Sequence, residues 1–185
     1  LSIADEYGAT PLPPYIRRKV NQEDAQRYQT IFAQETGSVA APTASLNMTD
    51  ELLQAIKMKE VEVVYLTLHV GRGTFLPIRS EKVDDHKMHE EYFEIPAETL
   101  GKIRSAKVQG GRVVALGTTV TRALEYAAGD ILRSSTQEVN GEADIFIYPG
   151  CEFHVVDVLL TNFHAPESTV IQLAAAFAGE DFLKT

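Results

Sequence analysis

An apolar run from Val61 to Val70 constrains this chain more than any other stretch, because its β-branched side chains predict a strand buried on both faces. The run leads directly into Gly71-Arg72-Gly73-Thr74, where two glycines allow a sharp turn and the close approach of a ligand. His69 and Arg72 therefore stand where a buried strand opens into a loop. Since ligands of α/β folds bind at the carboxyl ends of strands, this position predicts a binding site.

Predicted strands alternate with predicted helices along the chain. Apolar runs predict strands over residues 61–70, 88–95, 113–116, 145–148 and 155–160. Helical spacing and capping residues predict helices over residues 22–34, 49–59, 96–108, 120–128 and 166–178. This order predicts one α/β domain, with a largely parallel sheet covered by helices. The pattern alone does not separate an open doubly wound sheet from a barrel-like closure.

Composition narrows the function classes only mildly. The 185 residues carry a net charge of −9, which argues against a surface coated in positive charge to hold nucleic acid but allows a local basic face. The single cysteine, Cys151, excludes an internal disulfide framework and indicates a reducing cytoplasm. We expect no membrane anchor, because no apolar run is long enough to span a bilayer and the start lacks a secretory signal. The first residue is Leu1 rather than a methionine, so a segment of something longer is also expected.

Four predicted loops carry polar side chains suited to a ligand, and three of these loops follow a predicted strand. A small-residue loop over 38–43 would be a fifth. The polar sets are His69, Arg72 and Thr74; His86, Lys87 and His89; Thr118, Thr119 and Arg122; and Asn162 and His164. Each set also has a structural interpretation, since a single histidine near a strand end is often only a hydrogen-bonded structural residue.

Several specific sites are disfavoured by spacing. Gly71-x-Gly73 lacks the third glycine and the following helix of a dinucleotide fingerprint. The histidines at 86 and 89 match no standard metal-site spacing and have no cysteine partner. Gly117-Thr118-Thr119 before a helix suits an anion and a simple helix cap equally well. Spacing alone therefore predicts a ligand-binding α/β enzyme and no more.

A series of motifs runs along nearly the whole chain. The motifs are Thr10-Pro11-Leu12-Pro13-Pro14-Tyr15-Ile16-x-Arg18, Arg27-Tyr28-Gln29-Thr30, Gly37 to Ala44, Thr67-Leu68-His69-Val70-Gly71-x-Gly73-Thr74-Phe75-x-Pro77, His86-Lys87-Met88-His89-x-Glu91, Gly111-Arg112-Val113, Gly117-Thr118-Thr119-x-x-Arg122, Phe146 to Gly150, Leu159-Leu160-Thr161-Asn162-Phe163-His164-x-Pro166-x-Ser168-Thr169 and Ala176 to Gly179. Read together, these motifs resemble the S-adenosylmethionine:tRNA ribosyltransferase-isomerase family of queuosine biosynthesis. They occur in the family's order with similar gaps.

The resemblance implies a fold. Members of the family are longer, with an N-terminal part and a small inserted β-barrel domain before the Pro-Pro-Tyr segment, and with a C-terminal tail. Residues 1–185 then correspond to the later part of the main domain, which in this family resembles a modified, TIM-like α/β barrel. We therefore expect a single α/β domain here, without those three parts.

The resemblance also implies a reaction. The ribosyl moiety of S-adenosylmethionine, a co-substrate, moves onto a 7-aminomethyl-7-deazaguanine base in tRNA and rearranges to epoxyqueuosine, while adenine and methionine leave. No metal and no membrane are implied, and the cytoplasm is the expected compartment. By residue type, His69 or His164 is the candidate catalytic base. The candidate substrate-binding residues are Arg72, Thr74, His89, Thr118, Thr119, Arg122 and Asn162.

The sequence departs from the family pattern inside the expected ligand loops. Asn47 stands where the family has a histidine, so a proton carrier becomes a neutral amide. Arg72 replaces a small residue, Leu76 replaces glutamine, and Val120-Thr121 replaces Ser-Val. These changes keep a second hypothesis open, a divergent or non-catalytic paralogue that binds a nucleoside or tRNA. Fold alone also leaves a small-molecule hydrolase possible as a third.

Overall fold

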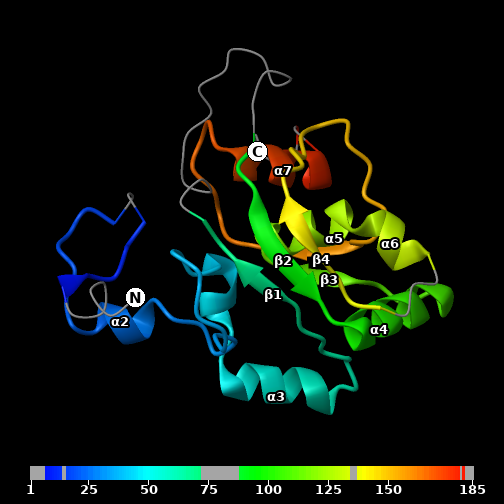
Figure 1. Ribbon diagram of the computed structural model, residues 1–185, viewed down its shortest axis with the longest axis horizontal. Helices are drawn as coiled ribbons and strands as arrows, with labels where there is room; N and C mark the ends of the chain where they lie inside the picture. Colours follow the sequence, from blue (N-terminus) through cyan, green and yellow to red (C-terminus); the bar gives the residue numbers. More distant parts are fainter. Residues whose placement is uncertain (1–6, 14–15, 72–87, 134–136, 180, 182–185) are drawn as a thin grey trace.

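The computed structural model describes residues 7–13, 16–71, 88–133, 137–179 and 181. Its body is a mixed α/β arrangement of two small sheets with helices against them, and the N-terminal segment with α2 lies to one side of that body (Figure 1). The elements are α2 Asp24–Arg27, the 3-10 helix η1 Thr43–Asn47, α3 Asp50–Met58, β1 Thr67–His69, β2 Glu91–Ile95, α4 Ala97–Val108, β3 Val114–Leu116, α5 Thr118–Tyr126, α6 Ala128–Leu132, β4 Val139–Ala143, β5 Val158–Leu160 and α7 Thr169–Ala178.

The larger sheet has the order β1-β2-β4, and both of its pairings are antiparallel. The prediction of mostly parallel strands is therefore wrong. β2 returns directly against β1, with Leu68 opposite Phe93, and β4 then runs back along β2. The order of elements along a chain reveals the alternation of strands and helices, but it does not reveal whether neighbouring strands pair parallel or antiparallel.

The smaller sheet pairs β3 with β5, and this pairing is parallel, as the alternation predicted. Asp157, just before β5, accepts a hydrogen bond from the Val113 amide at 2.8 Å, and the Gly117 amide donates to the Leu160 carbonyl at 2.9 Å. These contacts extend the strand register at both ends. The described strands thus form two separate sheets, so the barrel-like closure stays a prediction.

The hydrophobic core lies between the antiparallel sheet and helices α4, α5 and α6. Its most buried members are Phe93 and Ile95 from β2, Leu100 from α4 and Ile131 from α6. Alternation along β2 explains the choice, because Glu91, Phe93 and Ile95 face inward while Tyr92 faces out. Packing against the helices therefore covers one face of this sheet.

Several predicted elements differ in length or kind. The buried strand over 61–70 is assigned only at β1, and Val61 and Tyr65 are exposed, so burial on both faces is wrong. The helix over 22–34 shrinks to α2, although Asn21 Oδ1 does accept a hydrogen bond from the Asp24 amide. Residues 145–148 are not a strand, and β4 was not predicted.

The other helices agree with their predictions to within a few residues. α3 begins after Thr49, whose hydroxyl accepts a hydrogen bond from the Leu52 amide, and α4 begins after Pro96. The helix predicted over 120–128 begins earlier, at Thr118, and is followed by α6. α7 begins after Ser168, whose hydroxyl accepts from the Ile171 amide. Within the described residues, no helix is both long and apolar enough to cross a membrane.

Candidate functional site

One segment, residues 37–47, touches the loops that follow three strands, and we call it the connecting segment. At β1 the Ser38 hydroxyl donates to the Leu68 carbonyl at 3.1 Å and accepts from the Val70 amide at 3.0 Å. The Val39 amide also donates to the Val70 carbonyl. The segment is therefore fixed to the carboxyl end of β1, where the sequence predicted a binding loop.

The connecting segment then reaches the ends of β3 and β5. Ala44 lies against Gly117, since a Cβ added to Gly117 would lie 3.6 Å from the Ala44 Cβ. Three residues further, Asn47 Nδ2 donates to Asn162 Oδ1 at 2.7 Å. The predicted loops after β1, β3 and β5 are thus joined by direct contacts to one short segment, and these contacts define the candidate site.

His69, the last residue of β1, is half-buried and fixed from two sides. Its ring stacks on Tyr92 of β2, with the ring centroids 5.6 Å apart. On the other side lies Gly37, where an added Cβ would fall 2.5 Å from His69 Nδ1. Nδ1 is buried and has no hydrogen-bond partner among the described residues. A buried polar atom without a partner calls for an explanation. Two explanations are a catalytic role and a hydrogen bond to a bound ligand or water.

The N-terminus of α5 brings Thr118 and Thr119 to the end of β3. Both residues are buried, and Gly117 before them has φ +103°, a conformation that glycine adopts without strain. The N-cap position is this glycine, so neither threonine acts as the cap. The Thr121 hydroxyl donates back to the Gly117 carbonyl at 3.0 Å. Helix geometry leaves the first amides of α5 free for an acceptor, which is compatible with the predicted binding role.

Arg122 lies one turn further along α5 and points into the protein. Its guanidinium pairs with Glu91 at 2.9 Å, and it donates to the carbonyl oxygens of Ile145, Ala143 and His89. Burial lowers the pKa of Arg122, while Glu91 and Asp144 oppose that shift by charge. With four acceptors engaged, Arg122 holds α5 to β2 and β4, and its predicted contact with substrate stays a prediction.

Asn162 and His164 follow β5 and have different surroundings. Asn162 accepts from Asn47 and lines a pocket of about 220 Å³. His164 is half-buried, and its Nε2 lies 3.1 Å from the Thr161 hydroxyl. Burial lowers the pKa of His164, so its ring stays neutral to lower pH than a free histidine. A neutral imidazole can accept a proton, which suits the predicted base.

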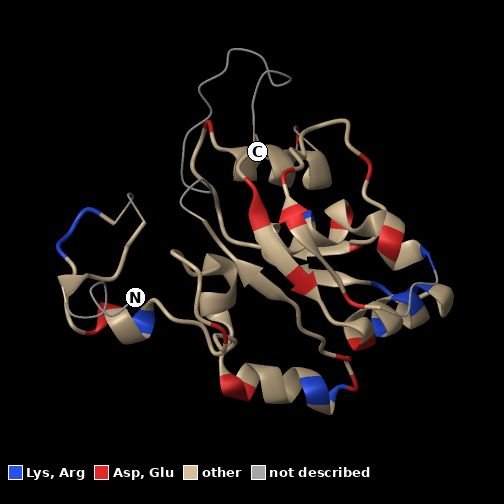
Figure 2. Ribbon diagram, in the orientation of Figure 1, with Lys and Arg blue, Asp and Glu red and all other residues tan. Residues whose placement is uncertain are grey.

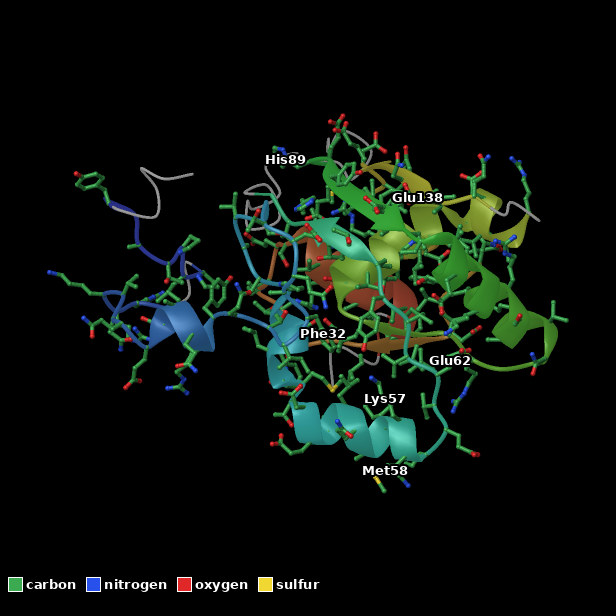
Figure 3. The ribbon with its side chains drawn as sticks, turned by 60° about the horizontal axis from the view of Figure 1, so that its bottom comes forward. Phe32, Lys57, Met58, Glu62, His89 and Glu138 are labelled. Carbon is green, nitrogen blue, oxygen red and sulfur yellow. The ribbon has the colours of Figure 1, made fainter. Side chains whose placement is uncertain are left out.

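His89 does not join these groups. Its side chain is exposed near the start of β2, and only its carbonyl contacts Arg122. Figure 3 shows His89 at the opposite side of the body from α3. Arg72 and Thr74 lie outside the described residues, as do Leu76, His86 and Lys87. No group of three or more potential metal ligands occurs within the described residues.

The sequence reasoning missed four partners of these residues. Asn47 was noted only as a departure, whereas it contacts Asn162 directly. Gly37 fixes His69, and Tyr92 and Glu91 supply the stacking ring and the buried carboxylate. The pairing of β1 with β2 places Tyr92 opposite His69, so the register would have revealed this contact once the pairing was known. The Asn47–Asn162 contact joins residues 115 apart and has no local signal.

An acidic area flanks β2 and β4. Glu94 lies in β2, Glu142 lies in β4, and Glu90 and Asp144 directly adjoin these strands, where Figure 2 shows acidic residues in red. Glu90 hydrogen-bonds to Glu142, and this contact, with the charges of Glu142 and Asp144, raises the pKa of Glu90. Such an area repels a phosphate backbone, so the acidic edge of the larger sheet is a poor surface for RNA.

Comparisons with known proteins come from three directions. The family model described as "Queuosine biosynthesis protein" matches residues 1–185. An S-adenosylmethionine:tRNA ribosyltransferase-isomerase of Chlorobaculum parvum is 62% identical over 181 residues, covering 97% of this chain and 53% of the relative. One from Halothermothrix orenii is 54% identical, covering 98% of this chain and 52% of the relative. The crystal structure of S-adenosylmethionine tRNA ribosyltransferase from Thermotoga maritima superposes with a TM-score of 0.61 at 41% identity, covering 76% of this chain and 43% of that one. The chain thus spans about half the length of the curated relatives it matches.

Proposed function

This chain belongs to the queuosine biosynthesis protein family, and on that basis we propose that it carries part of the active site of an S-adenosylmethionine:tRNA ribosyltransferase-isomerase. The observation that carries the proposal is the connecting segment, which joins the loops after β1, β3 and β5 into one site. The residues of these loops are those on which the family resemblance depends.

The proposed reaction transfers the ribosyl moiety of S-adenosylmethionine to the aminomethyl group of a 7-deazaguanine base in tRNA. The sulfonium acidifies the C5′ proton, so a neutral base close to that carbon can remove it. The departing adenine takes up negative charge, which hydrogen-bond donors stabilise. The product is epoxyqueuosine in tRNA, with adenine and methionine released. S-adenosylmethionine is consumed as a co-substrate, and the chemistry requires no metal.

Two histidines remain candidates for the base. His164 is a candidate because burial lowers the pKa of its ring and so favours the neutral form, which accepts a proton. His69 is a candidate because its buried Nδ1 has no hydrogen-bond partner among the described residues. We infer that Thr118 and Thr119 bind an anionic group such as the methionine carboxylate, which the free amides of the first turn of α5 support. Asn162 contributes a neutral amide, and Arg72, Thr74, His89 and Arg122 stay proposed substrate contacts.

A second candidate is a paralogue that binds a nucleoside or tRNA without turnover. One observation favours it, since the described residues that line the pocket beside Asn162 supply apolar side chains, two amides and a hydroxyl but no titratable side chain. Binding there would then occur without acid–base chemistry from the pocket itself.

The test is adenine release from S-adenosylmethionine in the presence of tRNA that carries 7-aminomethyl-7-deazaguanine. The variants His164→Gln and His69→Gln are made separately, and His154→Gln, at an exposed position before β5, serves as the control. Loss of the true base should lower the rate on the order of 10²- to 10⁴-fold, while the other variant and the control change it less.

The outcomes separate the candidates. Release of adenine that depends on one histidine supports the transferase-isomerase. Binding of S-adenosylmethionine or tRNA without release supports the paralogue. If neither ligand binds, both proposals for this chain are contradicted.

A further inference from the structure

The Asn47–Asn162 contact is oriented by a third group. Asn47 Nδ2 donates to Asn162 Oδ1 at 2.7 Å and also to the Ala44 carbonyl at 3.3 Å. Both hydrogens of that amide are therefore engaged, and the Asn47 side chain cannot be reversed without losing both bonds. The arrangement fixes which amide donates and which accepts.

The fixed orientation leaves one acceptor and one donor unused. Asn47 Oδ1 and the Asn162 NH₂ group have no partner among the described residues. If the two asparagines only connected η1 to the loop after β5, the existing Asn47–Asn162 hydrogen bond would be sufficient. The two unused groups belong to adjacent side chains, so they offer an acceptor beside a donor to a third molecule.

Both amides line the same pocket, and the rest of its wall is nearly all apolar. Leu116 and Leu160 come from the parallel strands, Met48 follows η1, and Leu52 comes from α3. Figure 3 shows α3 below the body with Met58 pointing away from it, whereas Leu52 of the same helix lines the pocket. Apolar walls with a few convergent polar groups are typical of small-molecule sites.

The size of the pocket limits the ligand. About 220 Å³ is below the roughly 300–1,000 Å³ of pockets that bury drug-sized molecules, so it suits one flat ring system. Proteins that hold a single base place its faces against apolar or aromatic side chains and read its edge with hydrogen bonds. Leu116, Leu160 and Met48 provide the first kind of contact here, and the two asparagines provide the second.

We propose that the Asn47–Asn162 pair, within this pocket, binds a purine-type base through an edge that has a hydrogen-bond donor beside an acceptor. Adenine has such an edge in its 6-amino group and N1 or N7, and a 7-deazaguanine has one in its O6 and N1–H. Asn162 donates to the acceptor of the base and Asn47 Oδ1 accepts from its donor. The choice of these two bases rests on the proposed function, whereas the pocket and its hydrogen-bonding pattern do not.

The test measures the binding of free nucleosides by calorimetry, with no turnover. Adenosine, 7-deazaguanosine, guanosine and purine riboside are the probes, and purine riboside lacks the 6-amino donor. On the unchanged chain, we expect purine riboside to bind roughly tenfold more weakly than adenosine, because one hydrogen bond is lost. The tighter of adenosine and 7-deazaguanosine identifies which base occupies the pocket.

Asn162→Asp provides a change of specificity that a structural role would not produce. The variant keeps an oxygen for Asn47 but replaces the donor with a second acceptor. Guanosine offers two adjacent donors, N1–H and its 2-amino group, whereas adenosine offers one donor and one acceptor. We therefore expect the ratio of adenosine affinity to guanosine affinity to fall on the order of ten- to hundredfold. Asn140→Asp, on an exposed position of β4, makes the same change of charge and should leave the ratio unaltered.

Each outcome decides the inference. A changed ratio in Asn162→Asp with a folded far-ultraviolet spectrum supports it. Equal losses for both nucleosides, equal binding of adenosine and purine riboside, or no nucleoside binding to the unchanged chain overturns it. A changed ratio without any adenine release would leave the base site standing and contradict the transferase activity, and release without a changed ratio would do the reverse.

Discussion

The antiparallel sheet β1-β2-β4 and the parallel pair β3-β5 use their side chains in different ways. In the antiparallel sheet, Phe93 and Ile95 are almost fully buried, and the charge of Arg122 is met by Glu91 and three carbonyl groups. In the parallel pair, Val114 and Leu160 are 56% and 53% exposed, and the neighbouring Asn47 and Asn162 keep hydrogen-bonding groups that no other described residue uses. The first region is packed and internally hydrogen-bonded, whereas the second exposes apolar and amide groups that a ligand could contact.

This difference shows that the type of a motif residue does not by itself reveal which contacts that residue makes. Arg122 is a cation in a motif that was predicted to bind substrate, and among the described residues it bonds to Glu91 and to backbone carbonyl groups. Asn47 is neutral and looked like a loss, yet it lies in the pocket. Burial and partner number, rather than residue type, separate the two roles.

The largest effect should come from disrupting the packed antiparallel sheet. Arg122→Met removes the guanidinium that pairs with Glu91, whose side chain is only 3% exposed, and we expect the free energy of unfolding to fall by about 3–5 kcal/mol. Urea denaturation measures this. Lys102→Met, which removes ion pairs to Glu62 and Glu98 on the surface, should lower the free energy of unfolding much less, because solvent screens exposed ion pairs. Equal losses in the free energy of unfolding for the two variants would contradict the comparison.

A smaller effect is expected where the connecting segment meets β1. In Gly37→Ala the new Cβ would fall 2.5 Å from His69 Nδ1, so the ring must move. We expect a loss of about 1–3 kcal/mol in the free energy of unfolding, together with a changed His69 ring signal in NMR spectra. Gly101→Ala in α4, where an added Cβ meets nothing within 4 Å, should be neutral or stabilising. An unshifted His69 signal in Gly37→Ala would show that the contact does not fix the ring.

A further test concerns α3, which flanks the open pocket and has no buried residues. Thr49→Ala removes the hydroxyl that accepts from the Leu52 amide at 3.2 Å, at a cost of about 1 kcal/mol. Because packing contributes little to α3, the loss should appear as faster hydrogen exchange in its first turn. Ser168→Ala removes the equivalent cap of α7, where Thr169 and Leu173 are buried, and exchange there should change less. The reverse ranking would contradict the view of α3 as the less packed helix.

The smallest effect is one of pH. Burial lowers the pKa of His164 in the folded protein below the value of 6.5 of a free histidine. The unfolded chain therefore binds more protons just below that pH, so stability should decline as the pH falls through about 6.5 toward the lowered value. Urea midpoints at several pH values measure the decline, and His164→Gln should remove this part of it. A midpoint that rises on acidification, and does so only when His164 is present, would contradict the sign.

Local patterns predicted much of the fold. α3, α4 and α7 follow their caps, prolines and apolar spacing, and β3 and β5 follow short apolar runs. β4 could not be found that way, because Val139-Asn140-Gly141-Glu142-Ala143 is polar and contains a glycine. The glycine is explained by the neighbouring strand, because Gly141 pairs with Phe93 of β2 and an added Cβ would lie 3.3 Å from the Phe93 ring. Conversely, residues 145–148 look like a strand, but the Ile145 carbonyl is used by Arg122.

The candidate site was predicted in outline but not in its connections. The sequence placed His69, Thr118 and Asn162 after strands, and the structure has each of them at the end of β1, β3 or β5. The contacts that join these ends come from the connecting segment, of which the sequence predicted only a possible fifth ligand loop over 38–43 and none of the contacts. Asn47 and Asn162 are separated by 115 residues, and no local pattern reports such a contact.

The connecting segment also has a consequence for the order of folding. Its hydrogen bonds reach 30 residues along the chain at Ser38–Leu68 and 115 at Asn47–Asn162. Closing long loops costs entropy before any contact compensates for it, so such contacts form late. During synthesis the base pocket cannot be complete until residue 162 has left the ribosome, long after α3 and β1. We expect pulse-labelled hydrogen exchange during refolding to protect α4 and α5 before η1, and earlier protection of η1 would contradict this order.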